Sequence, residues 1–183
     1  MGELFKVALC NCEPIFLRFL KERIIFRGGI SYGDAYIDLN RSMFFGEAIN
    51  RAYQLEAKTA LHPRIVVEPE VAEKVEESIS QAKHKMLAQN PEYVYLVGKK
   101  TVSMPEVGEG IIERDEDGQY IFNYLHFPEN NMICPDMYLS GKIYLEELLN
   151  FCYEQIDINT DYKIIDKYYY LLRYVKNKLR NLE

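Results

Sequence analysis

The sequence predicts an α+β fold: a partial antiparallel sheet with helices on one face, followed by a β-hairpin and two C-terminal helices. Over the first 90 residues, segments with apolar residues at helical spacing alternate with short β-branched segments. The run Asp115-Glu116-Asp117-Gly118 between two β-branched segments indicates a hairpin turn. The chain then ends in two long segments with apolar residues at helical spacing.

The first elements are predicted as a helix, two strands and a second helix. Apolar residues nearly all round 4–21 predict a helix packed against a sheet, which Pro14 would kink or split. The β-branched and aromatic segment 23–36 predicts a strand with a bulge at its glycines. After a polar turn, a strand over 42–45 precedes a helix over 46–59.

A buried strand and a long helix are predicted next. Pro63 bars the preceding helix from continuing, and 64–67 reads Arg-Ile-Val-Val, a buried strand. Pro69 opens a helix to about Gln89, because its missing N–H costs nothing at a helix start. A further short strand is predicted over 92–97.

The remaining elements form the hairpin and the last two helices. The hairpin strands are predicted over 110–114 and 120–125, and the helices over about 143–155 and 161–182. We treat 1–90 as an α/β core and 91–183 as hairpin and helices packed on that same core, a single domain overall. A chain of 183 residues with 48% hydrophobic content can bury one such core.

Charge and hydropathy exclude two classes of partner. The net charge of −6 argues against nucleic acid as a partner, because affinity for its backbone is built from Lys and Arg. No apolar run approaches the roughly 20 residues needed to cross a bilayer, and the N-terminus does not look like a signal peptide. We therefore expect a cytoplasmic protein without a membrane partner.

A set of motifs in order and at fixed spacing is similar to the class III nucleotide cyclases. In that family a strand of the form R-x-G-I-x-x-G precedes an aromatic–Gly pair and a helix reading N-x-A-x-R-L-E. The matching residues here are 27–33 (RGGISYG), 45–46 (FG) and 50–56 (NRAYQLE). Bacterial cyclases of cyclic-pyrimidine antiphage signalling (Pycsar) are the most similar in look. They share the helix AY-x-LE, the strand PRI, the hairpin D-x-DG-x-Y and the helix KY-x-x-L, found here at 52–56, 63–65, 115–120 and 167–171.

This resemblance implies a chemistry and a fold. The family cyclises a nucleoside triphosphate by attack of the ribose 3′-oxygen on the α-phosphate, with two divalent metals held by two aspartates. Those aspartates lie on strands that precede the helix predicted from Leu4 onward, so we expect a partial, ferredoxin-like cyclase sheet without them. The chain as given is then catalytically incomplete, with no cofactor of its own. Mg²⁺ or Mn²⁺ is expected if the metal-binding segment is supplied, with cUMP or cCMP as candidate products.

The resemblance also assigns roles to particular residues. Asn50 occupies the place of the family's ribose-orienting Asn, and Gln54 that of its transition-state Arg. Losing such a donor costs about 2.7 to 4 kcal/mol, and losing its charge no less, unless Arg51 or Arg27 supplies the cation. Met43 stands where adenylate-forming relatives place a base-reading acid, and it cannot accept a hydrogen bond from a base.

The substrate-binding set predicted from these motifs contains four residues, and no metal ligand is assigned. They are Met43, Phe45, Gly46 and Arg27. Asp34 and Asp38 would lie about 13 Å apart along a strand, too far to share a metal site. The pair Asp115 and Asp117 is interpreted as a hairpin turn in preference to a calcium loop, whose later oxygen ligands are missing.

Three interpretations stay open at the level of sequence. The first is a cyclase whose metal-binding segment lies upstream, and the second is a non-catalytic cyclase relative that dimerises or binds nucleotide as a regulator. The third is an α+β interaction domain with similarity of fold only. The expected partners are a second copy of the chain or a complete cyclase subunit, with a nucleoside triphosphate as ligand.

Overall fold

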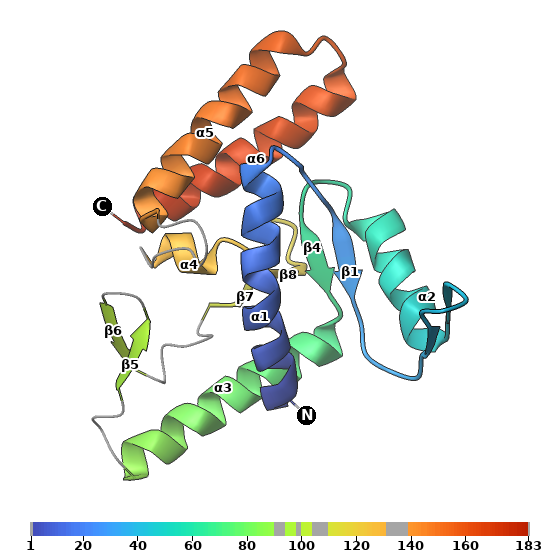
Figure 1. Ribbon diagram of the computed structural model, residues 1–183, viewed down its shortest axis with the longest axis vertical. Coiled ribbons are helices and arrows are strands. Elements are labelled where there is room, and N and C mark those ends of the chain that lie inside the picture. The colour runs from blue at the N-terminus through green and yellow to red at the C-terminus, as the bar shows by residue number, and fades with distance from the viewer. Residues whose placement is uncertain (1, 90–93, 98–99, 104–109, 131–138, 183) are drawn as a thin grey trace.

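A four-stranded sheet forms the centre of the molecule. The computed structural model describes residues 2–89, 94–97, 100–103, 110–130 and 139–182. The sheet has the order β1-β4-β8-β7 (Figure 1). Its strands are β1 (Gly28–Ile30), β4 (Ile65–Val67), β7 (Ile112–Arg114) and β8 (Tyr120–Phe122). Both halves of the chain therefore contribute to one sheet, and the predicted α+β class is confirmed.

Helices surround this sheet. In Figure 1, α1 crosses the sheet, α3 lies at one end, and α5 and α6 form an antiparallel pair at the other. The helices are α1 (Gly2–Lys21), α2 (Glu47–Gln54), α3 (Pro69–Gln89), α4 (His126–Glu129), α5 (Gly141–Ile158) and α6 (Tyr162–Arg180). The described residues contain no helix that is both long enough and apolar enough to span a bilayer.

The prediction of a wholly antiparallel sheet is wrong at one pair of strands. β1 runs parallel to β4, whereas β4 with β8 and β7 with β8 are antiparallel. Between β1 and β4 the chain passes through a small hairpin and through α2. A crossover of this length returns the chain in its original direction, which is what a parallel neighbour requires.

Helices cover both faces of the sheet, which corrects the prediction of one covered face. On one face Phe16 of α1 contacts Phe122, with ring centroids 5.7 Å apart. On the other face Lys178 of α6 pairs with Glu113. Glu113 lies opposite Ile121 in the register, and adjacent side chains of a strand point to opposite faces. Double coverage explains why every residue of β4 is buried.

The first helix is continuous across Pro14, so the predicted kink or split is wrong. Glu13 and Leu17 on either side of the proline have no exposed surface, and Leu20 is 3% exposed. Tertiary packing of these residues against the sheet and α4 holds the helix despite the hydrogen bond that proline removes.

The predicted strand over 23–36 is much shorter than expected. It ends at Ile30, and the chain then leaves the sheet because the Ser31 hydroxyl donates to the carbonyl of Ala48 in α2. A separate two-stranded hairpin follows, β2 (Tyr36–Asp38) with β3 (Met43–Phe45), which matches the predicted strand over 42–45. Asp38 closes its turn by accepting from the backbone N–H groups of Asn40 and Arg41.

The other predicted elements are found with shifted ends. The helix over 46–59 is α2 continued by a π-helical turn, η1 (Leu55–Thr59). The strand over 92–97 corresponds to β5 (Val94–Val97), paired with β6 (Lys100–Ser103), while residues 92 and 93 lie outside the described residues. The last two helices are capped by the Ser140 and Asp161 side chains, which fix where α5 and α6 begin.

Candidate functional site

Helix α2 carries the predicted catalytic residues and is held on β1 by a close backbone approach at Gly29. A Cβ atom at Gly29 would lie 2.2 Å from the carbonyl oxygen of Ala52 and 2.8 Å from the Cβ of Leu55. Only a glycine tolerates this approach. Gly29, the glycine of the motif R-x-G-I, therefore allows the short distance between α2 and β1.

The predicted pair Phe45-Gly46 forms the junction between the hairpin and α2. Gly46 is the N-cap of α2 with φ +141°, a backbone conformation that side-chain-bearing residues rarely adopt. A Cβ atom there would also lie 2.5 Å from the carbonyl oxygen of Asp34. Gly46 is thus required by the turn and by the segment packed on it.

Asn50 and Gln54 lie on the same exposed side of α2. They are one helical turn apart, so their side chains project together from the helix. Both are exposed, and neither side chain makes a hydrogen bond to any part of the chain that the structure describes. Their amide donors and acceptors are available to a ligand. Tyr53, which is 69% exposed, lies between them in the sequence.

The two arginines considered as substitutes for the family's cation are both occupied. Arg51 pairs with Glu47 at 2.6 Å and with Glu68 at 2.9 Å, and it also donates to the carbonyl of Tyr32. Arg27 pairs with Glu56 of η1, the turn that continues α2. These contacts lock α2 onto the neighbouring segments. Each guanidinium group therefore has at least one carboxylate beside it.

Met43 and Phe45 lie on a hairpin that exposes apolar side chains on both of its faces. Tyr36 and Phe45 are register partners whose rings stack with centroids 4.7 Å apart, and Met43 shares their face. Ile37 and Phe44 form the register pair of the opposite face, 59% and 54% exposed. A hairpin normally packs one face on its own core. Among the described residues, the side chains on both faces of β2–β3 stay largely exposed.

A second polar centre joins three of the motifs that carry the family resemblance, and sequence reasoning missed it. Arg64, of the motif PRI, is 4% exposed and binds Asp115 and, at 2.7 Å, Asp117 of the hairpin turn. It also donates to the carbonyl of Thr59 at the end of η1. The hydroxyl of Tyr170, in the KY-x-x-L helix, donates to Asp115 at 2.7 Å.

Arg64 therefore ties the end of η1, the β7–β8 turn and α6 together. The hydrogen bond from Arg64 keeps the pKa of Asp117 below its usual range. The turn predicted at 115–118 is confirmed, with Gly118 at φ +80°, and its aspartates bind this arginine. The available signal was a cation placed directly before the apolar run Ile-Val-Val, because an arginine inside a core needs a carboxylate partner.

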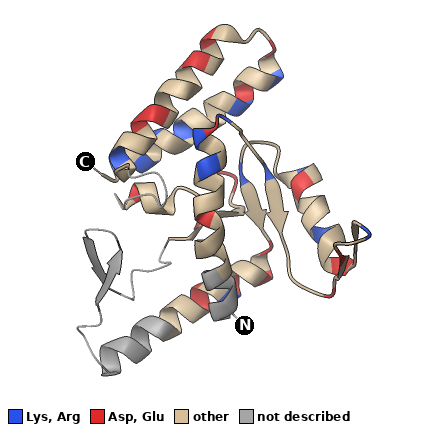
Figure 2. Ribbon diagram, in the orientation of Figure 1, with Lys and Arg blue, Asp and Glu red and all other residues tan. Residues whose placement is uncertain are grey.

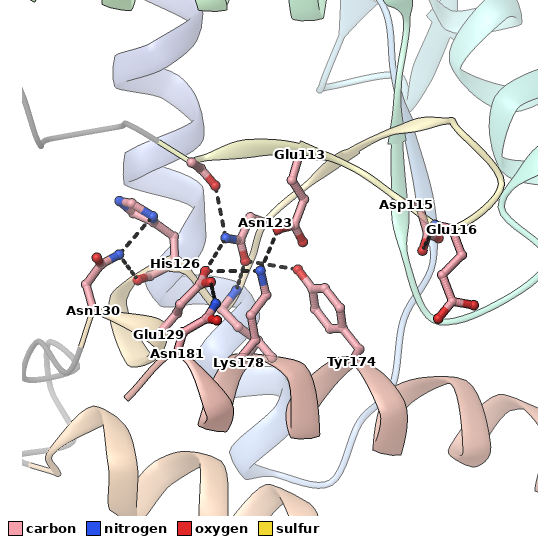
Figure 3. A network of polar contacts seen from close by, with 12 residues as sticks. Glu113, Asp115, Glu116, Asn123, His126, Glu129, Asn130, Tyr174, Lys178 and Asn181 are labelled. Atoms are coloured by element: carbon pink, nitrogen blue, oxygen red, sulfur yellow. Dashed lines mark hydrogen bonds and ion pairs between the residues drawn. The ribbon is translucent and has the colours of Figure 1, made fainter. Parts of the chain in front are cut away.

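A buried lysine organises a further network between β7, α4 and α6 (Figure 3). Lys178 donates to Glu113 and, at 3.0 Å, to Glu129. Asn123 donates to the same Glu129 at 2.8 Å and accepts from the Tyr174 hydroxyl at 2.9 Å. Burial alone would raise the pKa of Glu129, but Lys178 and the donated hydrogen bonds hold it below its usual range. The sequence signal was a lysine on the apolar side of α6.

Two titratable groups beside this network are buried and form no ion pair with the residues that the structure describes. His126 is 3% exposed, and burial lowers its pKa to about 4, so it is neutral at physiological pH. Glu13 has no exposed surface, and burial raises its pKa to about 8. One carboxyl oxygen of Glu13 accepts from the backbone N–H of Phe127, which joins α1 to α4. Both groups act as packing elements.

Cavities occur at a distance from the predicted site residues. One of about 130 Å³ lies between the β7–β8 hairpin and α6, next to Asp115, Tyr170 and Lys178. Another of about 320 Å³ lies between the end of α1 and α5, next to Leu20 and Phe151. Neither is lined by the six predicted residues, which are Arg27, Met43, Phe45, Gly46, Asn50 and Gln54. Of those six, Asn50 and Gln54 lie on α2, Gly46 is its N-cap, Met43 and Phe45 lie on β3, and Arg27 precedes β1 and pairs with Glu56 of η1.

The chemistry available at these residues is hydrogen bonding and apolar contact. Asn50 and Gln54 offer amide groups, while Met43 and Phe45 offer apolar surface beside them in the chain. Within the residues that the structure describes, no three His, Cys, Asp or Glu side chains come together as ligands for one ion.

Comparison of the chain with protein-family models, with curated proteins and with solved structures gave no match.

Proposed function

We propose that this chain is a class III cyclase-like module that contributes one half of a nucleotide site to an assembly with a second subunit. The observation that carries the proposal is the exposed pair Asn50 and Gln54 on a helix whose position is fixed by Gly29 and Arg51. A rigid helix with outward amides is suited to orient a ligand held mainly by another surface. The family resemblance supplies the identity of that ligand, a nucleoside triphosphate.

In this proposal each predicted residue has a limited task. Asn50 orients the ribose through its carboxamide, and Gln54 donates to the triphosphate without adding charge. Met43 contacts the base without reading a hydrogen-bond pattern, so base choice rests with the other half of the site. Mg²⁺ or Mn²⁺, with the carboxylates that hold it, would come with the completing subunit.

The uncovered β2–β3 hairpin is the surface on which we place that subunit. Its exposed apolar side chains are Tyr36, Ile37, Leu39, Met43, Phe44 and Phe45. Covering the exposed half of each would contribute about 1 kcal/mol apiece, or roughly 6 kcal/mol before the cost of association. This hairpin runs directly into α2, so docking there would bring the second subunit to Asn50. A complete cyclase subunit or a second copy of the chain fits this surface.

The experiment measures nucleotide binding and turnover by the purified chain. Equilibrium titrations with UTP, CTP, ATP and GTP in Mg²⁺ compare the wild type with Asn50→Ala, and with Gln81→Ala, an exposed amide on α3, as the matched control. We expect Asn50→Ala to weaken binding by about tenfold, the value of one lost hydrogen bond, and Gln81→Ala to leave it unchanged. Equal binding by all three proteins would refute the half-site.

A cyclisation assay tests incompleteness separately. Incubation of the chain alone with each triphosphate and Mg²⁺ or Mn²⁺ is expected to yield no cyclic monophosphate. Formation of cUMP, cCMP or another cyclic product, abolished by Asn50→Ala, would show an autonomous enzyme of the kind that produces antiphage signals.

The alternative function is a dimerisation module that binds no nucleotide, and the apolar hairpin favours it. Its signature is self-association lost in Phe44→Ser, together with nucleotide binding that is absent in the wild type. Phe44 is exposed, so its replacement leaves the folded core intact.

A further inference from the structure

The outer face of the α5–α6 pair carries opposite charges on its two helices. In Figure 2 several acidic residues are coloured along the ribbon of α5, and several basic residues along the ribbon of α6. The acidic strip consists of Glu146, Glu147, Glu154 and Asp157, all exposed. The basic strip consists of Arg173, Lys176 and Arg180, at the spacing of one helix side.

The two strips lie side by side on one surface. Tyr153 of α5 is 42% exposed, and the ammonium of Lys176 in α6 lies 5.2 Å from its ring centroid. Tyr153 is four residues before Asp157 and seven after Glu146, so all three share a side of α5. Tyr169, 46% exposed, occupies the corresponding place on α6, four residues before Arg173. Two exposed tyrosines therefore lie among the acidic residues of α5 and the basic residues of α6.

The charges of these strips are not neutralised by one another. Glu154 pairs with Arg23 beyond α1, at 3.1 Å, and Arg173 reaches Glu116 of the β7–β8 turn at 3.8 Å. Across the ranges that the structure describes, no ion pair joins the acidic strip to the basic strip. Within the residues that the structure describes, the strip members without an ion pair are Glu146, Glu147 and Asp157 on α5 and Lys176 and Arg180 on α6. These side chains present charge of one sign on each helix to the solvent.

We propose that this face binds a second copy of the chain through a twofold axis running parallel to α5 and α6. Such an axis lays α5 of one protomer over α6 of its partner, and the reverse contact follows by symmetry. Each acidic strip then meets a basic strip, twice per dimer, while Tyr153 and Tyr169 of both protomers fill the centre. Exposed aromatics surrounded by complementary charge are the usual composition of a protein interface.

This surface is distinct from the β2–β3 hairpin. The α5–α6 pair and the hairpin are well separated in Figure 1, so one can be occupied without the other. A chain with both surfaces could pair with itself through α5–α6 while its hairpin and α2 receive the completing subunit.

The experiment reverses each strip separately in the full chain. One variant carries Glu146→Lys and Asp157→Lys, and the other carries Arg173→Glu and Arg180→Glu. Sedimentation equilibrium over the micromolar range is run on the wild type, on each variant and on their equimolar mixture. Far-UV circular dichroism of each variant verifies that the fold is retained.

We expect a wild-type dimer that weakens as salt is raised, at least tenfold weaker dimerisation in each variant, and recovery in the mixture. Recovery follows because one variant presents two basic strips and the other two acidic strips. A monomeric wild type would overturn the proposal, as would variants that dimerise like the wild type or a mixture that does not recover. Retention of a monomeric wild type on heparin, lost in Arg173→Glu with Arg180→Glu, would indicate an anionic partner instead. Phe44→Ser should leave this dimer unchanged, which separates it from the hairpin surface.

Discussion

Replacement of the buried Glu13 by glutamine should remove a specific part of the pH dependence of folding. Glu13 has no exposed surface, and one of its carboxyl oxygens lacks a hydrogen-bond partner. Burial raises its pKa from 4.5 to about 8, with a further rise from Glu129 and an opposing effect of Lys178. The folded protein therefore holds a proton that the unfolded chain releases. Stability falls as the pH rises between these two values and levels off above pH 8.

The size of the effect follows from that shift. His126 has the opposite effect on stability, because burial lowers its pKa to about 4. Its contribution to the free energy of unfolding grows as the pH rises and is complete near the ordinary pKa of 6.5. The interval from about pH 6.5 to 8 thus isolates Glu13. Stability changes by about 1.36 kcal/mol per pH unit, and by less as the pH approaches the pKa of the folded state. The free energy of unfolding of the wild type should therefore fall by about 1.6 kcal/mol between pH 6.5 and 8.

Urea unfolding followed by circular dichroism at several pH values measures this loss. Glu13→Gln should keep the acceptor for the Phe127 N–H and flatten the dependence over that interval. Glu22→Gln, an exposed position just after α1, is the matched control and should retain the wild-type slope. Equal slopes for the wild type and Glu13→Gln would refute the buried, protonated state of this side chain.

Three substitutions test the packing around α2 and α6, each by its free energy of unfolding in urea. Gly29→Ala should lower the free energy of unfolding by about 1 to 3 kcal/mol, because its Cβ would overlap the backbone of α2. Gly28→Ala should be neutral, because no atom lies nearer than 3.7 Å to a Cβ at that position. Similar costs for the two variants would contradict the close approach at Gly29. Arg64→Ala should lower the free energy of unfolding by about 3 to 5 kcal/mol, because it leaves the buried Asp115 without its cation. The exposed Arg41→Ala should cost less than about 1 kcal/mol. A small cost for both variants would contradict the buried ion pair. Lys178→Met should cost about 3 to 5 kcal/mol because two glutamates lose their shared cation; an unchanged stability would exclude that network as a stabilising unit.

Local patterns were sufficient for most of the helices and for the β7–β8 hairpin. The apolar run Ile-Val-Val predicted β4, and the Asp-Gly turn predicted the β7–β8 hairpin. Pro69 marked the start of α3 as expected. These signals are short-range, so the sequence carries them without knowledge of the rest of the fold.

Long-range packing decided the features that the sequence did not reveal. The continuity of α1 across Pro14 depends on burial against other elements, and the parallel pairing of β1 with β4 depends on the path of the crossover. The residues around Arg64 come from segments more than fifty positions apart, as do Lys178 and its partner Glu113. Periodicity cannot report such pairings.

The place of Asn50 and Gln54 on a helix could be predicted from the sequence, whereas their role in a nucleotide site stays a prediction. Asn50 and Gln54 fall on an exposed helix side, which the motif and the helical period anticipated. The occupation of Arg51 and Arg27 by carboxylates could not be read from the sequence, because Glu68 and Glu56 are joined to them only by the fold. Because both arginines have carboxylate partners, the proposed half-site depends mainly on the side-chain amides of Asn50 and Gln54.

The central claim, that a nucleotide binds at the exposed amides of α2, is tested most directly by NMR of the side-chain amide groups. UTP and the other triphosphates with Mg²⁺ are titrated into the ¹⁵N-labelled chain, and the Asn50, Gln54 and Gln81 resonances are followed. We expect saturable shifts of the Asn50 and Gln54 amide resonances, while the Gln81 resonance on α3 stays in place. Saturable shifts confined to other regions, or no shift of the two α2 amides at any concentration, would contradict it.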